Sequence, residues 1–381
     1  MERVNLVTST LRQQAGCSRY FLLMVKSYRL ILVPIVIFIF FALLGSAFLF
    51  AATSRPNLRS AAKLRSNTAS TRQAIRNTQT MISMPRFMYG TAWKKDRTKD
   101  LVELAVRTGF RGIDTACQPK HYFEPGVGEA LQALYTEGVV TREDIFLQTK
   151  FTSLNGQDPN NIPYDKNSNL SQQVHESFVV SCQNLRTPYV NSLVLHGPMP
   201  RFADTMQIWR AMEEIHSTGG ALQLGISNTY DIKTLRQLYT EASVKPTVLQ
   251  NRFYADSGYD KEIRAFCKEH SIAYQSFWTL TANPHILKRY LLSICSLHRY
   301  ISVQLIVNLD FPSQPFFSGA MKQLTKKYSM TAEQVFFMFV QALGITPLTG
   351  SSSEVHMKQD LDTLSVTMDA ADVELLNGML G

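Results

Sequence analysis

The chain has 381 residues, five cysteines and a formal net charge of +9, a length that allows one large domain with an added segment. Residues 1–84 contain eleven Lys and Arg and one acid, Glu2, for a formal charge of +10, which leaves −1 of the total for residues 85–381. Because the larger part of the chain is nearly neutral, we exclude a nucleic acid as its natural ligand. The cysteines have neither CxxC nor zinc-ligand spacing, so we expect no metal site and no disulfide framework: they are Cys17, Cys117, Cys182, Cys267 and Cys295.

An uncharged run follows a basic N-terminal segment at residues 1–29. Residues 30–52 (LILVPIVIFIFFALLGSAFLFAA) contain no Asp, Glu, Lys or Arg. At about 1.5 Å per residue, a helix of this length crosses a hydrocarbon core about 30 Å thick. We therefore predict one transmembrane helix over residues 30–52 and a single-pass membrane protein. A cleaved signal peptide is the alternative, but its apolar part usually covers only about 7 to 15 residues.

The residues that flank this run leave its orientation open. Lys and Arg occur on both sides, and orientation follows the side that has more of them, so the side of the main domain is undetermined, with the cytosolic face slightly preferred. Residues 53–84 are rich in Ser, Thr, Ala and Arg and contain no acid. This composition predicts a basic flexible linker, either near anionic headgroups or simply disordered. Met81 or Met84 would make a natural start for a product without the anchor.

After Pro85 the chain alternates short β-branched runs with amphipathic stretches of helical spacing. Helical patterns include 99–108, 172–184, 205–216 and 332–343. Eight alternations of strand and helix favour a closed α/β (β/α)₈ TIM barrel over residues 85–381, rather than an open doubly wound sheet. The predicted strands cover 87–91, 111–114, 145–149, 192–196, 222–226, 247–250, 272–276 and 345–348.

Polar residues follow these strands at their carboxyl ends, where barrels of this kind build their active sites. Asp114, Lys150 and His196 end the second, third and fourth strands. Each alone is more often part of an ion pair or a satisfied core group, but here they converge on one face. The other strand-end residues are Ser227 and Asn228 after the fifth strand, Gln250 in the sixth, and 349–352 after the eighth.

This set suits proton transfer. A lysine beside an aspartate stays an ammonium, and a nearby ammonium lowers the pKa of a tyrosine from about 10 because it favours the phenolate. Tyr122, on the loop after the second strand, is the available tyrosine. We expect it to give and take a proton near neutral pH, while His196 orients and polarises a carbonyl group.

Over nearly all of residues 85–381 the chain resembles the aldo-keto reductase superfamily. Seven strings in order carry the resemblance: GTAW (90–93), GIDTA (112–116), VGEAL (127–131), FLQTK (146–150), LHGP (195–198), GISN (225–228) and LQ (249–250). The resemblance implies reduction of an aldehyde or ketone to an alcohol by hydride transfer from NADPH. NADH stays possible, and neither a Rossmann domain nor a metal is implied. The small-molecule carbonyl substrate and the oligomeric state stay open.

The resemblance also implies residue roles. Tyr122 is the proton donor, Lys150 and Asp114 tune it, and His196 positions the carbonyl. Trp93 and Trp278 are walls of the substrate pocket, with core packing as the equal alternative. The implied cofactor-binding residues are Ser227, Asn228 and Gln250 at the carboxamide, Phe277 stacked on the nicotinamide, and Gly90, Thr91, Thr349, Gly350, Ser351, Ser352 and Lys358 elsewhere.

The chain departs from the family pattern in several places. The tyrosine usually lies five residues after the aspartate, where this chain has Pro119, so Tyr122 requires a longer loop. Gly197 replaces the tryptophan that often follows the histidine, which predicts a wider pocket. The family usually has Lys-Ser and a downstream Arg for the adenosine 2′-phosphate, but this chain has a Ser-rich run at 349–353 instead. Their absence weakens the case for NADPH over NADH. The Ser-rich run could still bind a phosphate at the start of a helix, and it is also typical of a helix cap.

The stretch 286–317 resembles nothing in the family. It is apolar and β-branched, and we interpret it as an atypical insertion into the barrel, either specific to a lineage or the translation of an unspliced intron. Two rival functions also stay open. One is a cofactor-binding regulatory subunit of a membrane partner with little turnover, and the other is an inactive barrel whose folding the insertion prevents.

Overall fold

The computed structural model describes residues 83–287 and 315–380. The predicted transmembrane helix at 30–52 lies outside these residues, together with the basic segment before it and nearly all of the linker. Within the described ranges, no helix has the length and apolar character needed to cross a membrane.

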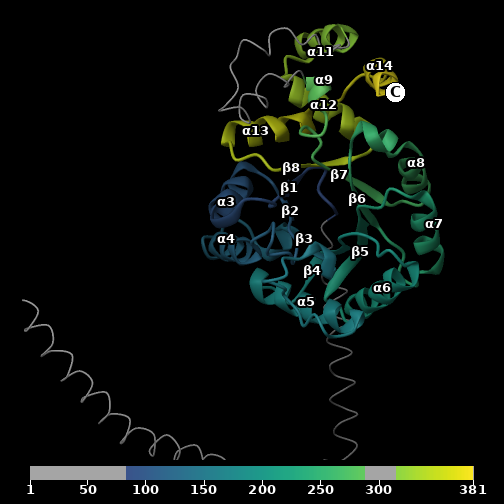
Figure 1. The fold of residues 1–381 in the computed structure, drawn as a ribbon. Coiled ribbons are helices and arrows are strands. Elements are labelled where there is room, and N and C mark those ends of the chain that lie inside the picture. The colour runs from purple at the N-terminus through teal and green to yellow at the C-terminus, as the bar shows by residue number, and fades with distance from the viewer. Residues whose placement is uncertain (1–82, 288–314, 381) are drawn as a thin grey trace, which may run out of the picture. The chain divides into compact units, whose positions relative to one another are not determined.

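Eight parallel strands form a closed barrel in the order of the chain, surrounded by helices (Figure 1). Each of the eight predicted strands overlaps an observed one, so the predicted (β/α)₈ barrel is confirmed. The strands are β1 (Met88–Gly90), β2 (Gly112–Asp114), β3 (Phe146–Phe151), β4 (Val190–Leu195), β5 (Ala221–Ser227), β6 (Val248–Arg252), β7 (Ala273–Phe277) and β8 (Thr346–Thr349).

Local sequence signals account for several helix starts. Asp231 and Asn169 accept backbone N–H groups at two helix starts, and Thr331 forms a capping box with Gln334 at a third. The described helices are α3 (Thr98–Thr108), α4 (Glu124–Thr136), α5 (Leu170–Leu185), α6 (Phe202–Ser217), α7 (Ile232–Glu241), α8 (Lys261–Glu269), α9 (Pro284–Leu287), α11 (Pro315–Tyr328), α12 (Ala332–Ala342), α13 (Glu354–Asp362) and α14 (Ala370–Met379).

The alternation of side chains along the strands separates two layers of core. Tyr89 belongs to the main apolar cluster, in which strand residues pack outward against the surrounding helices. Met88, Phe146 and Leu348 form a smaller cluster of their own. Gly128 lets α4 approach α5, because a Cβ there would lie 2.0 Å from the backbone oxygen of Asn184.

Three glutamines form a polar layer inside the barrel. Gln148 and Gln250 donate to Oε1 of Gln275 at 2.7 and 2.8 Å. Gln275 in turn donates to Sδ of Met84 at 3.0 Å. The amides therefore satisfy one another, as buried polar groups must, and they support the strand ends above them.

Most of the atypical stretch at 286–317 lies outside the described residues. Its two ends do not: α9 contains Ile286 and Leu287, both buried, and α11 begins at Pro315. Further along α11, Met321 and Leu324 join the main core. The stretch therefore separates two helices that both pack on the barrel between β7 and β8.

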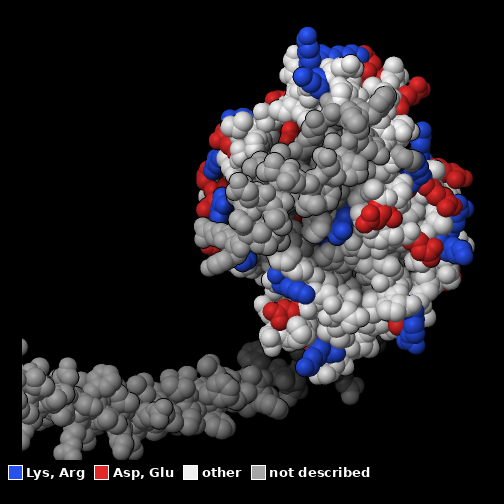
Figure 2. Space-filling view, turned by 45° about the horizontal axis from the view of Figure 1, so that its top comes forward, with Lys and Arg blue, Asp and Glu red and all other residues white. Residues whose placement is uncertain are grey.

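Charged groups on the surface are mixed in sign. Among the coloured residues on the face that Figure 2 shows, Lys and Arg are interspersed with Asp and Glu. This distribution agrees with the near-neutral formal charge of residues 85–381.

Candidate active site

A cavity of about 940 Å³ opens at the carboxyl ends of the strands. Its volume lies within the range of ligand pockets, which is about 300 to 1,000 Å³. Most of the predicted site residues line it: Gly90, Trp93, Asp114, Tyr122, His196, Ser227, Asn228, Gln250, Phe277, Trp278, Thr349, Gly350, Ser351 and Ser352.

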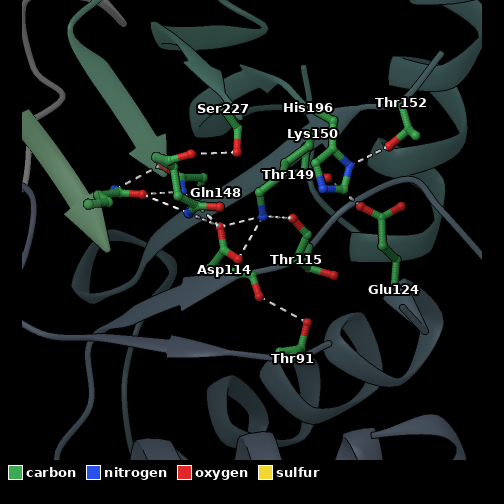
Figure 3. A network of polar contacts seen from close by, with 12 residues as sticks. Thr91, Asp114, Thr115, Glu124, Gln148, Thr149, Lys150, Thr152, His196 and Ser227 are labelled. Atoms are coloured by element: carbon green, nitrogen blue, oxygen red, sulfur yellow. Dashed lines mark hydrogen bonds and ion pairs between the residues drawn. The ribbon is translucent and has the colours of Figure 1, made fainter. Parts of the chain in front are cut away.

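Lys150 and Asp114 form a buried ion pair at the floor of the cavity (Figure 3). Nζ of Lys150 lies 2.6 Å from both carboxylate oxygens of Asp114 and donates to the backbone oxygen of Thr115 at 2.9 Å. Gln148 and Gln250 also donate to Oδ1 of Asp114, at 2.8 and 3.0 Å. Burial lowers the pKa of Lys150, and the Asp114 carboxylate opposes this shift and favours the ammonium.

The loop between β2 and α4 brings Tyr122 to this pair. The backbone N–H of Tyr122 donates to the oxygen of Gln118, whose side chain donates to the oxygen of Gly156 at 2.6 Å. The Tyr122 ring centre lies 5.3 Å from Nζ of Lys150 and 6.1 Å from the ring centre of His196. The residues from 115 to 123 thus provide the longer loop that Tyr122 requires.

The pKa of Tyr122 shifts in the opposite direction to the predicted one. Burial raises the pKa of the phenol, and the negative charge of Asp114 raises it further. The ammonium of Lys150, which is paired with Asp114 at 2.6 Å, does not reverse this direction. Tyr122 is therefore protonated at neutral pH, as a proton donor has to be.

His196 is held by a neighbour that sequence reasoning missed. Its Nδ1 lies 2.7 Å from Oγ1 of Thr152, the residue after β3. Burial lowers the pKa of His196 to about 3, assisted by the charges of Lys150 and His121, so the imidazole is neutral. Thr152 lies two residues after Lys150, and the alternation of the strand could have indicated that both face inward.

Ser227, Asn228 and Gln250 lie together beside His196. Oγ of Ser227 donates to the backbone oxygen of Gln250 at 2.6 Å, and Nδ2 of Asn228 donates to the backbone oxygen of His196 at 2.8 Å. Because the amide hydrogens of Gln250 go to Asp114 and Gln275, its Oε1 is the acceptor available to a ligand. Asn228 has a φ of 51°, a left-handed conformation that asparagine tolerates.

Both predicted tryptophans line the cavity, which disfavours the core-packing alternative. Trp93 is 58% exposed and Trp278 is 48% exposed. Both have a positive φ, 64° and 54°, which is unusual for a bulky residue and marks strain of the kind found at functional sites. The Trp93 ring lies 4.0 Å from the His121 ring.

Two predicted cofactor residues do not reach the cavity wall. Lys358 is exposed on α13 and pairs with Glu354 at 2.5 Å, one helical turn away, whereas His356 lines the cavity. Thr91 is buried, and its Oγ1 donates to the backbone oxygen of Asp114 at 2.9 Å. Ser353 caps α13 by accepting from the N–H of His356, so the Ser-rich run is both a helix cap and a cavity wall.

Four charged residues in the cavity wall were not predicted: Lys94, Arg252, Glu333 and Asp360. Lys94 donates to the backbone oxygen of Gly350, and burial lowers its pKa. Burial raises the pKa of Asp360 to about 7. Arg252 lies two residues beyond Gln250 in β6 and lines the cavity as well, so strand alternation was the signal that could have found it.

Comparison with known proteins identifies relatives over this same region. The model of the Aldo/keto reductase family matches residues 86–380. The chain is 27% identical over 311 residues to the NAD/NADP-dependent indole-3-acetaldehyde reductase of Schizosaccharomyces pombe, a match that covers 79% of this chain and 92% of that protein. It is 26% identical over 232 residues to the glyoxal reductase of Bacillus subtilis, which covers 60% of this chain and 75% of that protein.

Solved structures share the fold. An aldo/keto reductase of Brucella melitensis gives a TM-score of 0.58 at 22% identity, covering 78% of this chain and 95% of that one. A Bombyx mori aldo-keto reductase in complex with NADP gives a TM-score of 0.58 at 19% identity, covering 78% and 89%. At these identities the likeness concerns the barrel itself.

Proposed function

The chain belongs to the aldo/keto reductase family over residues 86–380, and on that premise we propose how its cavity reduces an aldehyde or ketone to an alcohol. The chain is an oxidoreductase, and its reaction is carbonyl reduction that depends on NAD(P)H. One observation carries the proposed mechanism: Asp114, Tyr122, Lys150 and His196 converge at one end of the cavity. The names of the two relatives favour aldehydes as substrates.

The residues present fit a nicotinamide dinucleotide. Ser227, Asn228 and Gln250 place polar groups, among them Oε1 of Gln250, where the carboxamide would bind, and Phe277 offers a flat apolar face in the same cavity wall. At the other end, residues 349–352 and His356 line the cavity at the start of α13, and helix starts attract phosphate. Because the imidazole of His356 offers a weaker phosphate contact than a lysine or arginine would, we propose that the chain uses both NADPH and NADH.

The proton transfer follows from the geometry. Reduced nicotinamide supplies the hydride that the carbonyl carbon accepts. We assign the hydroxyl of Thr152 as donor to Nδ1 of the neutral His196. The ring hydrogen is then on Nε2, from which it donates to the carbonyl oxygen and orients it. The protonated Tyr122 then gives its hydroxyl proton to that oxygen.

The buried pair supports this step. As Tyr122 becomes a phenolate, the ammonium of Lys150, 5.3 Å from the ring centre, stabilises the new negative charge. Asp114 holds Lys150 in its charged form at 2.6 Å. The phenolate then recovers a proton from solvent through the open cavity. No observation favours a regulatory subunit without turnover, since all four groups lie together.

The experiment that tests this mechanism uses the full-length chain, NADPH and then NADH, and a panel of aldehydes and ketones. Tyr122→Phe should lower kcat by roughly 10² to 10⁴-fold, the usual contribution of a positioned acid. Tyr239→Phe, a substitution outside the cavity lining, is the matched control and should behave as wild type. Turnover that survives in Tyr122→Phe would show that another group supplies the proton.

The uncharged run at residues 30–52 supports a further proposal, that it anchors the enzyme in a membrane with the barrel on the cytosolic face. The full-length chain should then stay with membranes after alkaline carbonate extraction, and a product that starts at Met84 should not. If the barrel faces the cytosol, protease that is added only to the lumenal side of the membrane should leave the barrel intact. Release of the full-length chain by carbonate would rule the anchor out.

A further inference from the structure

Arg252 occupies a distinctive place in the cavity wall. It ends β6, two residues beyond Gln250, and therefore points to the same side of the strand. In the strand register it lies opposite Phe277 of β7. The guanidinium thus lies one step above the polar layer, toward the mouth of the cavity.

Aromatic rings hold this guanidinium in place. Its centre lies 4.3 Å from the Trp278 ring and 5.1 Å from the Tyr254 ring. The backbone N–H of Arg252 also donates to the hydroxyl of Tyr230 at 3.1 Å. Stacking of this kind fixes the plane of the guanidinium and leaves its edge for hydrogen bonding.

Among the described residues, no carboxylate forms an ion pair with this guanidinium. Within residues 83–287 and 315–380, none of the ion pairs includes Arg252. Its Nε is buried without any hydrogen-bond partner. By contrast, the buried ammonium of Lys150 donates to both oxygens of Asp114 and to the backbone oxygen of Thr115. A partly buried cation without a partner is costly, so the arrangement requires a functional explanation.

We propose that Arg252 is an oxyanion-binding residue of the catalytic cavity, which selects ligands that carry a carboxylate or a phosphate. A planar guanidinium binds either group through two parallel hydrogen bonds. Two molecules bring such a group into this cavity: a carbonyl substrate with a carboxylate, and the dinucleotide with its diphosphate. The inference rests on the proposed function, because it concerns the substrate and cofactor of the same cavity.

The geometry of the barrel sets the reach of this residue. His196 follows β4, and one strand separates β4 from β6, so the two chain positions are roughly 10 Å apart across the sheet. The guanidinium of Arg252 lies against the ring of Trp278, which directly follows β7. A substrate with a few atoms between its carbonyl and its carboxylate therefore spans from His196 to Arg252.

The test compares two probes on the full-length chain: 4-carboxybenzaldehyde and its neutral analogue methyl 4-formylbenzoate. We would measure kcat/KM for both with NADPH, the Kd of NADPH by quenching of tryptophan fluorescence, and the Kd of terephthalate by calorimetry with NADP present. The variants are Arg252→Gln, which removes the charge, and Arg252→Lys, which keeps the charge but loses the planar edge. Arg236→Gln is the matched control, because Arg236 also stacks on a ring, that of Phe266 at 5.2 Å, but lies outside the cavity.

If the substrate brings the oxyanion, Arg252→Gln should lower the preference for acid over ester and weaken terephthalate by about 10- to 100-fold, as expected for a charged hydrogen bond. If the dinucleotide brings it, the Kd of NADPH should rise by a similar factor and the preference should not change. Arg252→Lys should fall between wild type and Arg252→Gln. The inference is overturned if Arg252→Gln matches Arg236→Gln in all three measurements.

Failure of the proposed function is distinguishable from failure of this inference. A wild-type chain that turns over neither aldehyde contradicts the proposed function. The Kd values of terephthalate and NADPH need no turnover, and they still decide whether Arg252 binds an oxyanion.

Discussion

Replacing Thr152 by valine should impair catalysis without touching a group that reacts. Thr152 is buried, and its Oγ1 lies 2.7 Å from Nδ1 of His196. Valine has nearly the same shape but no hydroxyl. The backbone oxygen of Thr152 keeps its bonds from Tyr164 and Gln157, at 2.8 and 3.1 Å, so the strand end should stay in place.

The expected magnitude follows from the lost contact. An unsatisfied partner in a buried site costs about 1 to 3 kcal/mol, which corresponds to roughly a 5- to 160-fold loss in kcat/KM at 1.36 kcal/mol for each factor of ten. Without the hydroxyl, the neutral His196 can carry its hydrogen on Nδ1 and present a lone pair to the carbonyl oxygen. The loss should therefore appear in kcat/KM for the carbonyl substrate and not in the Kd of NADPH.

Steady-state kinetics with one aldehyde, cofactor titration and urea unfolding would together decide this prediction. Thr152→Ser restores a hydroxyl at the same atom and should recover most of the activity. A purely structural role would instead reduce the free energy of unfolding and leave kcat/KM intact once the variant is folded. The reasoning about His196 would be refuted by Thr152→Val with wild-type kinetics, or by Thr152→Ser as impaired as Thr152→Val.

Three further predictions concern charge. Lys150→Met leaves the Asp114 carboxylate buried without its cation and should lower the free energy of unfolding by about 3 to 5 kcal/mol, measured in urea, together with a loss of turnover. His356→Arg should shift the ratio of Kd values toward NADPH over NADH by about tenfold through a charged contact with the 2′-phosphate, whereas Lys358→Gln should leave that ratio unchanged. Burial lowers the pKa of His196 from 6.5 to about 3, so between these pH values the folded chain binds fewer protons than the unfolded chain. The free energy of unfolding should therefore fall as the pH falls from 6.5 to about 3. An equal dependence on pH in His196→Gln would contradict the assignment to His196.

The closed barrel could be predicted from local patterns alone. Eight β-branched runs alternate with amphipathic stretches, and each predicted strand overlaps an observed one. In a barrel of parallel strands all carboxyl ends meet on one face. For that reason Asp114, Lys150 and His196, which are far apart in the chain, could be expected in one place from their positions at strand ends.

Other parts of the site depended on contacts that no local pattern contains. The approach of Tyr122 to Lys150 depends on a nine-residue loop, from 115 to 123, that is pinned to Gly156. The direction of the Tyr122 pKa depends first on burial and then on the charge of Asp114, whereas from the sequence we expected the ammonium of Lys150 to dominate. A pKa responds to solvent exclusion and to every charge within a few ångströms, and both arise only when distant segments pack together.

The cavity wall shows the same division most clearly. Successive residues of an α-helix are rotated by about 100°, so His356 and Lys358 face different directions. His356 lines the cavity, whereas Lys358 faces solvent beside Glu354. The directions of these side chains depend on the residue at which α13 begins, and Ser353 caps that start. The Ser-rich run alone allowed the helix to begin a residue or two earlier or later. The sequence by itself thus determined the barrel and the chemistry of its strand ends. The tertiary structure decided what these and neighbouring side chains contact, such as Thr152 at Nδ1 of His196 and Arg252 at the Trp278 ring, because those contacts depend on packing between elements and not on the order of residues within one.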